Sequence, residues 1–240
     1  MPRFSLHKEP YELNSWTSFV ESVDPGITEW MARVVDEMNY DAMRVGESAD
    51  QTKLGKKVFD PKVMNEYFKV RFAERKYTAK KIPTYSVNSP SVARILRDIP
   101  FGDRIHYLRA HGIKFREGYM ECDFTNEKGL LFEVQFGKYP FGWWDVEKSQ
   151  DFITRREARA ACIILPMDEM LQEMNTGPGC YDSLMTMLED RHAEKRISTP
   201  FMVHGIAVDY SIGTTGRSSF TSKLKQKREP KHMHQQSFSF

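Results

Sequence analysis

Three acidic side chains are spaced so that they could share one face of a β-hairpin: Glu121, Asp123 and Glu133. Residues 118–124 and 130–136 both alternate apolar with polar side chains, which predicts two strands. The five residues between them include a glycine and suit a hairpin loop. If Phe124 pairs with Leu130, the apolar faces of the two strands coincide, and Glu121 lies directly opposite Glu133.

Such a cluster of acids suggests a metal site. Like charges that face each other across two strands destabilise a hairpin unless water or a cation neutralises them. Mg²⁺ typically takes one or two carboxylates together with substrate phosphates, and basic side chains could hold those phosphates. The basic residues upstream are Arg71, Arg75, Lys76, Lys80, Lys81, Arg94, Arg97 and Arg104. Acids for a metal and bases for phosphates together suggest phosphoryl or nucleotidyl transfer. The alternative is the solvated polar face of a half-buried sheet.

The elements that must position this cluster indicate an α+β fold. The first 70 residues contain apolar side chains at helical spacing, as at 14–23, and two good helix starts are Thr28 and the Asp60-Pro61 pair. We expect a helical part over 1–70 and an α+β core over 71–216. Together they would form one globular domain with a central mixed or antiparallel sheet, in which helices flank the 118–136 hairpin.

The second half of the chain alternates further helices with one more strand. Asp145 can cap a long helix that runs through Arg159 to Ile164, where Pro166 ends it. Two further helices are expected over 168–174 and 183–196, and a last strand over 201–210.

Short motifs in the middle of the chain resemble those of RelA/SpoT-type nucleotide pyrophosphokinases and of related domains in bacterial polymorphic toxins. The resemblance covers roughly residues 71–159. Its elements are a Ser-Pro helix start at 89–90 after basic residues, an Asp-containing segment that ends in Gly102-Asp103-Arg104, the pair Gly118-Tyr119, and Glu133-Val134-Gln135. The resemblance implies a mixed sheet flanked by helices, related to nucleotidyltransferases.

The same resemblance assigns roles to individual residues. The residues that would contact the ATP phosphates are Arg75, Lys80 and Arg94, with Arg97 and Arg104 beside them. Either Asp98 or Asp103 would bind Mg²⁺ together with Glu133, which would also be the catalytic base that activates the acceptor hydroxyl. Tyr119 would stack on the acceptor base. The expected activity is an ATP- and Mg²⁺-dependent transfer to a nucleotide or RNA acceptor.

Composition excludes several other classes of protein. The chain has 240 residues, of which 40% are hydrophobic and 28% are charged, as in a soluble globular protein. The longest apolar run, over 160–167, is far shorter than the roughly 20 residues that span a bilayer. The N-terminus lacks the apolar core of a secretory signal. Three cysteines at wide spacings suggest neither a disulfide framework nor a zinc site. We therefore expect a cytoplasmic protein without an integral membrane segment.

Charge is concentrated at the C-terminus. Residues 217–240 contain six basic residues and one acid, so this segment is expected to be a flexible basic tail of net charge +5. Lysine and arginine gain free energy when they release counterions from phosphates, so the tail could bind RNA or DNA. The second hypothesis is therefore a non-enzymatic nucleic-acid-binding or assembly protein, for example a viral one.

Overall fold

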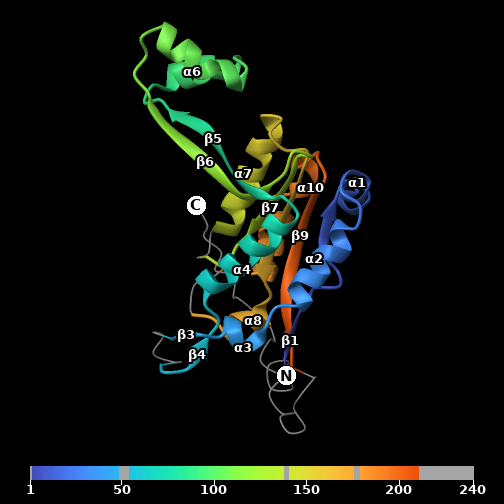
Figure 1. Ribbon diagram of the computed structural model, residues 1–240. Coiled ribbons are helices and arrows are strands. Elements are labelled where there is room, and N and C mark those ends of the chain that lie inside the picture. Colours follow the sequence, from blue (N-terminus) through green and yellow to red (C-terminus); the bar gives the residue numbers. More distant parts are fainter. Residues whose placement is uncertain (1, 49–53, 138–140, 176–178, 211–240) are drawn as a thin grey trace, which may run out of the picture.

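A seven-stranded mixed sheet forms the centre of the protein (Figure 1). The computed structural model describes residues 2–48, 54–137, 141–175 and 179–210. The strand order is β1-β9-β8-β7-β6-β5, and β2 also pairs with β9. The strands of this sheet are β1 (Arg3–Leu6), β2 (Tyr11–Leu13), β5 (Thr78–Ser86), β6 (Arg116–Thr125), β7 (Leu130–Val134), β8 (Ala160–Pro166) and β9 (Phe201–Asp209). A separate two-stranded sheet consists of β3 (Gly46–Glu47) and β4 (Lys57–Val58). The expected mixed sheet flanked by helices is confirmed.

The three central strands β7, β8 and β9 run parallel to one another. Every residue of β8 is buried, as expected for a parallel strand covered on both faces. The predicted helix from Asp145 to Ile164 is therefore wrong in its second half. Helix α7 (Phe141–Thr154) ends first, and the apolar run becomes β8. Periodicity alone cannot separate a buried strand from a buried helix when every residue is apolar.

Helices cover both faces of the sheet and enclose two hydrophobic cores. The first face carries α1 (Trp16–Val23), α2 (Ile27–Asp36), α3 (Tyr40–Met43), α4 (Pro61–Glu74) and α8 (Asp168–Leu171). Its core is rich in aromatic rings, among which Phe72 stacks on Phe124 with ring centres 4.4 Å apart. The second face carries α7, α9 (Tyr181–Asp190) and α10 (Ala193–Arg196). The central strands are thus held rigidly between two apolar layers.

The N-terminal part is not purely helical. Strands β1 and β2 precede α1 and pair with β9, so the chain begins by completing the sheet. The predicted helical part over 1–70 is corrected accordingly. The predicted basic tail, 217–240, lies outside the described residues. Among the described helices, none is long and apolar enough to cross a membrane.

Strands β5 and β6 form a long antiparallel ribbon that leaves the body of the protein (Figure 1). At its far end the chain folds into α5 (Pro90–Arg97) and α6 (Phe101–Ala110). We call residues 87–115, which join the two strands, the helical arm. Serine 89 caps α5 through its side chain, and Pro90 occupies the first turn, where its missing N–H costs no hydrogen bond.

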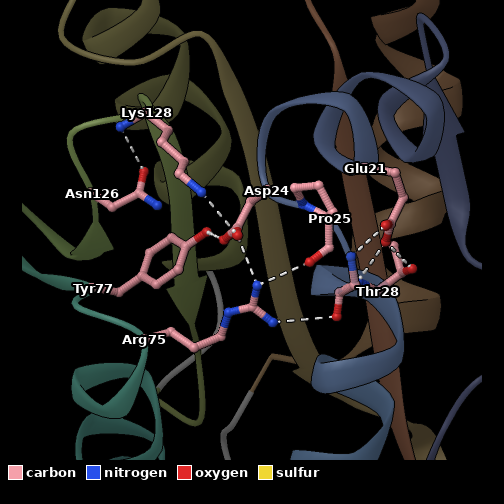
Figure 2. Close-up of polar contacts among 9 residues, drawn as sticks. Glu21, Asp24, Pro25, Thr28, Arg75, Tyr77, Asn126 and Lys128 are labelled. Atoms are coloured by element: carbon pink, nitrogen blue, oxygen red, sulfur yellow. Dashed lines mark hydrogen bonds and ion pairs between the residues drawn. The ribbon is translucent and has the colours of Figure 1, made fainter.

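A buried aspartate ties the α1–α2 turn to the β6–β7 turn (Figure 2). Asp24 accepts hydrogen bonds from the Tyr77 hydroxyl at 2.8 Å, from Arg75 Nη2 at 2.7 Å and from Lys128 Nζ at 3.1 Å. Within the β6–β7 turn, the Asn126 side chain accepts from the Lys128 amide at 3.1 Å. These contacts fix the turn that sets the pairing of β6 with β7.

Candidate active site

The pairing of β6 with β7 decides which acids meet. Phe124 lies opposite Phe132, two residues away from the predicted pairing of Phe124 with Leu130. Asp123, and not Glu121, therefore lies next to Glu133. The Asp123 amide donates to Glu133 Oε2 at 3.3 Å. A shift of two residues keeps the alternation of side chains along a strand, so the apolar pattern could not distinguish the two registers. In the structure β6 also has an irregularity here, and Cys122 packs in the second core while Phe124 packs in the first.

The Asp123 side chain is fixed by the backbone of the neighbouring strand. Its Oδ2 accepts a hydrogen bond from the Val134 amide at 2.9 Å. The residue is nevertheless exposed to solvent, unlike the adjacent Glu133. Asp123 therefore forms the accessible edge of the site, and its carboxylate is held in one position.

Glu133 is the buried member of the pair. It is only 1% exposed. Its Oε2 accepts from Lys148 Nζ at 2.9 Å, and Lys148 extends from α7 on the second face of the sheet. Its Oε1 is buried and has no hydrogen-bond partner in the part of the chain that the structure describes. A buried polar atom without a partner is costly, so this oxygen indicates a place for a ligand.

Two further residues, Asp145 and Gln135, complete a connected polar cluster that the sequence patterns did not predict. Lys148 Nζ also lies 2.9 Å from Asp145 Oδ1, one turn earlier on α7. Asp145 Oδ2 accepts from Gln135 Nε2 at 2.8 Å, and Gln135 Oε1 accepts from the Gly137 amide at 2.6 Å. The spacing of these residues was a partial signal: residues two apart on a strand, such as Glu133 and Gln135, share a face, and so do residues three apart on a helix, such as Asp145 and Lys148. Spacing alone, however, does not show that this helix packs against that strand.

Burial dominates the electrostatics of this cluster. Burial raises the pKa of the Glu133 carboxyl well above its usual range, the Asp123 charge raises it further, and Lys148 opposes the rise. The pKa of Asp145 is raised by burial in the same way, again against the effect of Lys148. Burial would lower the pKa of Lys148, but the two carboxylates outweigh burial and raise it. Lys148 is thus a permanent cation that compensates part of the negative charge.

The donor set fits a hard divalent cation. Mg²⁺ needs only one or two protein carboxylates, because water and substrate phosphate supply its other ligands. Glu133 Oε1 is unpartnered, and the exposed Asp123 lies beside it. A cation here would satisfy the orphaned oxygen and relieve the repulsion between two adjacent acids.

A groove of about 590 Å³ runs from this site along the first face of the sheet. Asp123 and Val134 form part of its wall. Helix α4 contributes four polar side chains to the opposite wall, namely Lys62, Asn65, Glu66 and Lys69. Asp123 therefore opens onto an accessible surface that also carries positive charge.

A different group of potential metal ligands has another explanation. Within the described ranges, Asp168, Cys180 and Asp182 are the group of three such side chains whose ligand atoms lie within 4.8 Å of one another. The Cys180 thiol donates to Asp168 Oδ1 at 2.8 Å, and burial raises its pKa. A protonated thiol that donates a hydrogen bond is not a thiolate ligand, so we assign no metal to this group.

The remaining predicted acids do not join the cluster. Glu121 is exposed and lines the groove, but its carboxylate lies 3.4 Å from Lys81 Nζ and is not part of the connected cluster around Glu133. Asp98 and Asp103 are exposed on the helical arm, at the end of α5 and in the first turn of α6. The predicted set of five metal ligands is thus reduced by the geometry to Asp123 and Glu133.

The predicted phosphate contacts also lie apart from one another. Arg75 binds Asp24, as described above, and Lys80 Nζ pairs with Glu157 at 2.6 Å. Arg104 is used inside the helical arm, where its Nε donates to the Ile99 carbonyl at 2.7 Å. Tyr119 is exposed, and the Lys81 ammonium lies 4.4 Å from its ring centre.

Arg94 and Arg97 are exposed on the helical arm. The predicted basic residues therefore do not converge on one triphosphate, and the ATP-binding arrangement is corrected.

Comparison with known proteins gives a consistent result. The model of the restriction endonuclease BglII/BglIII family matches residues 11–206. The solved structure of restriction endonuclease BglII complexed with a DNA 16-mer is similar, with a TM-score of 0.55 and 18% sequence identity, and the match covers 82% of this chain and 74% of that chain. Free BglII is similar with a TM-score of 0.50 and 14% identity, over 85% of this chain and 80% of that chain. No curated protein matches the sequence.

These matches overturn the functional predictions made from the sequence. The family match contradicts the resemblance to RelA/SpoT-type pyrophosphokinases and to toxin domains, and with it the predicted transferase activity. ATP, nucleotide and RNA find no support. The alternative of a non-enzymatic binding or assembly protein is not supported either. The short motifs misled because an acidic hairpin with upstream arginines is common to unrelated phosphate-handling folds.

Proposed function

We propose that this chain, which belongs to the restriction endonuclease BglII/BglIII family, hydrolyses phosphodiester bonds of double-stranded DNA with Mg²⁺. The reaction would take place at the cluster of Asp123, Glu133, Gln135 and Lys148. The structure of a DNA complex of the similar enzyme BglII supports duplex DNA as the partner.

One observation carries the proposal. Glu133 is 1% exposed, its Oε1 is without a partner among the described residues, and Asp123 lies beside it at the edge of a groove. In this proposal Asp123 and Glu133 hold the Mg²⁺ ion. When bound, the ion would supply Lewis-acid chemistry: it would stabilise negative charge on the phosphoryl group and favour deprotonation of the attacking water.

The other residues orient these two carboxylates. Lys148 holds Glu133 Oε2, so that Oε1 points to the ligand. Asp145 in turn holds Lys148 and Gln135. The ammonium of Lys148 adds a fixed positive charge close to the scissile phosphate, where negative charge increases in the transition state. These side chains are fixed by packing between β7 and α7, so little reorganisation is needed on substrate binding.

The groove gives the phosphate backbone a place beside the acids. Lys69 lines it, and its Nζ lies 3.4 Å from Glu66 with 70% of the Lys69 side chain exposed. An ion pair so exposed contributes little free energy, so a phosphate can displace the carboxylate. Asn65 on the same helix offers amide donors to a phosphate oxygen.

Digestion of supercoiled plasmid and long genomic duplexes with Mg²⁺ tests the proposal. The wild-type chain should produce discrete fragments, and chelation of the metal should abolish them. D123N and E133Q should each reduce the cleavage rate on the order of 10²-fold or more. E127Q is the matched control, because Glu127 is an exposed acid of the adjoining β6–β7 turn that does not line the groove, and it should leave the rate unchanged. Absence of metal-dependent cleavage on all duplexes, or full activity of E133Q, would refute the assignment.

A further inference from the structure

We propose that the helical arm, residues 87–115, binds the phosphate backbone of duplex DNA outside the segment that is cut. This inference rests on the proposed nuclease function and extends it. It gives the β5–β6 ribbon a role in holding the substrate, in addition to the chemistry at Asp123 and Glu133.

The position of the arm is the first observation. Strand β6 runs from the arm at Arg116 to the candidate active site at Asp123, and the ribbon carries α5 and α6 away from the body (Figure 1). Seven residues of strand span roughly 23 Å. Base pairs in a duplex are about 3.4 Å apart, so for a duplex that runs along the ribbon the arm would reach DNA about seven base pairs from the scissile phosphate.

The distribution of charge is the second observation. The arm contains five basic and two acidic residues, a net charge of +3. The whole chain carries +2 and residues 217–240 carry +5, so residues 1–86 and 116–216 together carry −6. An acidic body repels a polyanion, and the arm supplies a positive surface on a separate projection. Such charge separation is typical of a surface that receives nucleic acid.

The basic side chains of α5 are available for a ligand. Arg94 and Arg97 lie three residues apart in the last turn and therefore share one side of the helix. Both are exposed, and neither forms an ion pair with any residue in the described ranges. Arg104 differs, because it is satisfied by the Ile99 carbonyl of the arm and by the Tyr85 hydroxyl of β5. Arg109 is paired as well, with Glu117 of β6, so the arm combines two partnered arginines with two that project into solvent.

The arm is also attached firmly to the body. Arg155, at the end of α7, donates to the Pro83 carbonyl at 3.0 Å, and its guanidinium carbon lies 3.4 Å from the centre of the Phe101 ring. Phe101 in turn stacks on Tyr85 with ring centres 5.7 Å apart. Because the Arg155 side chain is only 10% exposed, this contact holds the arm at one angle. A fixed arm binds DNA with less loss of conformational entropy than a mobile one.

A second copy of this chain is the competing occupant, because its acidic body also complements the arm. The regular spacing of its phosphate charges favours duplex DNA over a second copy as the occupant. A duplex presents phosphates at every step, and exposed arginines bind them without a shaped pocket, whereas a protein partner usually requires a buried apolar centre. In the described part of the arm, Ile95 is the large apolar side chain with high exposure. Binding of a second copy is therefore an outcome of the test.

The test compares binding to a 12-base-pair and a 30-base-pair duplex of arbitrary sequence, without Mg²⁺ and at several salt concentrations. R94A/R97A should weaken binding to the long duplex by about 10-fold or more at 0.1 M salt and reduce the magnitude of the log–log salt slope by about 1.8. Binding to the short duplex, which ends before the arm, should not change. The control is R33A/K195A, which removes two exposed charges from the body.

The possible outcomes are distinct. If R94A/R97A binds both duplexes as the control does while the wild type still cuts plasmid, the arm proposal is overturned and the nuclease proposal stands. If the wild type neither binds nor cuts any duplex, the nuclease proposal fails and the arm proposal fails with it. If R94A/R97A changes the sedimentation of the free protein but not its DNA affinity, the arm binds a second copy, which also overturns the proposal.

Discussion

The Lys148 ammonium and the Glu133 carboxylate form a buried ion pair of 2.9 Å that connects the second helical layer to the central sheet. This pair leaves one carboxylate oxygen of Glu133 without a partner among the described residues. The same lysine neutralises Asp145, so three charges share one small volume. The ion pair therefore makes burial of the acid tolerable and fixes one oxygen of its carboxylate, so that the other oxygen is left for a ligand.

Replacement of Lys148 by methionine should destabilise the protein and abolish cleavage. The change leaves two buried acids without a cation, and loss of one partner of a buried pair typically costs about 3–5 kcal/mol. Urea unfolding at pH 7 measures this loss. In the double variant E133Q/K148M the cost should be clearly smaller than the sum of the two single variants, because the charges disappear together. Additive effects would contradict the coupling.

Cleavage should increase with pH as Glu133 loses its proton. Burial, and then the charge of Asp123, raise the pKa of this carboxyl, so its protonated form persists above the ordinary range. A protonated acid binds a cation poorly. Substitution D123N removes the nearby charge and should move the titration midpoint of Glu133 to lower pH in a carboxyl-detected NMR titration. E121Q should leave that midpoint where it is, and an unmoved midpoint in D123N would contradict the proximity of the two acids.

Sequence patterns predicted local features of the site better than its assembly. The two strands of the acidic hairpin were predicted, and Asp123 and Glu133 were among the acids proposed as metal ligands. The register was wrong by two residues, because a shift by an even number keeps the alternation of side chains along each strand and leaves no local signal. The turn contacts of Asp24 with Lys128, which cross more than 100 residues of sequence, fix the actual register. Long-range contacts of this kind have no local signal.

The identity of the fold was also hidden in one segment. The run over 160–166 is uniformly apolar, so neither a helical nor a strand period is visible in it. Because this run was interpreted as a helix, the predicted sheet lacked the parallel strand β8, which pairs with both β7 and β9. Without β8, nothing in the prediction fixed the position of the preceding helix relative to β7. Lys148 and Asp145 could therefore not be placed against that strand.

Loss of the Tyr77 hydroxyl should destabilise the fold by about 1.5–3 kcal/mol, as expected for a hydrogen bond to a buried charge. Burial raises the pKa of Asp24, but hydrogen bonds from Tyr77, Lys128 and Arg75 outweigh it and hold the pKa below the ordinary 3.8. The stabilisation is therefore present above that value and is lost as pH falls through the lower folded-state pKa.

Urea unfolding of Y77F at neutral pH and near pH 3 tests both statements. The difference in the free energy of unfolding between Y77F and the wild type should be smaller at the lower pH. Y119F is the control, because Tyr119 is an exposed ring on the ribbon and should leave stability unchanged. A Y77F chain as stable as the wild type at neutral pH would show that Asp24 does not depend on this hydroxyl.

Removal of the Arg155 side chain should loosen the helical arm without unfolding the body. The variant R155A loses the hydrogen bond to Pro83 and the contact with the Phe101 ring, together on the order of 1–3 kcal/mol. Hydrogen exchange should become faster over residues 87–115 and stay unchanged in β8. The control R156A removes an exposed neighbour. Equal exchange in R155A and wild type would show that the arm is held by other contacts.

The stability of the protein should decrease between pH 6.5 and about 4 because of His204 on β9. Burial lowers the pKa of this imidazole to about 4, with a smaller contribution in the same direction from His7 and an opposing one from Glu12. Its Nδ1 has no hydrogen-bond partner in the described part of the chain. Unfolded chains bind a proton near the ordinary pKa of 6.5, whereas the folded protein does not until about 4. Proton uptake therefore favours the unfolded state over this interval.

Urea unfolding of the wild type and of H204F at pH 7 and pH 4.5 measures this contribution. The wild type should lose about 2–3 kcal/mol more than H204F over that interval, since each pKa unit corresponds to about 1.36 kcal/mol. Comparison with H106N, which changes an exposed histidine of the helical arm, separates this effect from general titration. If H204F and the wild type lose the same free energy, His204 is protonated in the folded protein at pH 4.5, and the interior of β9 accepts the charge.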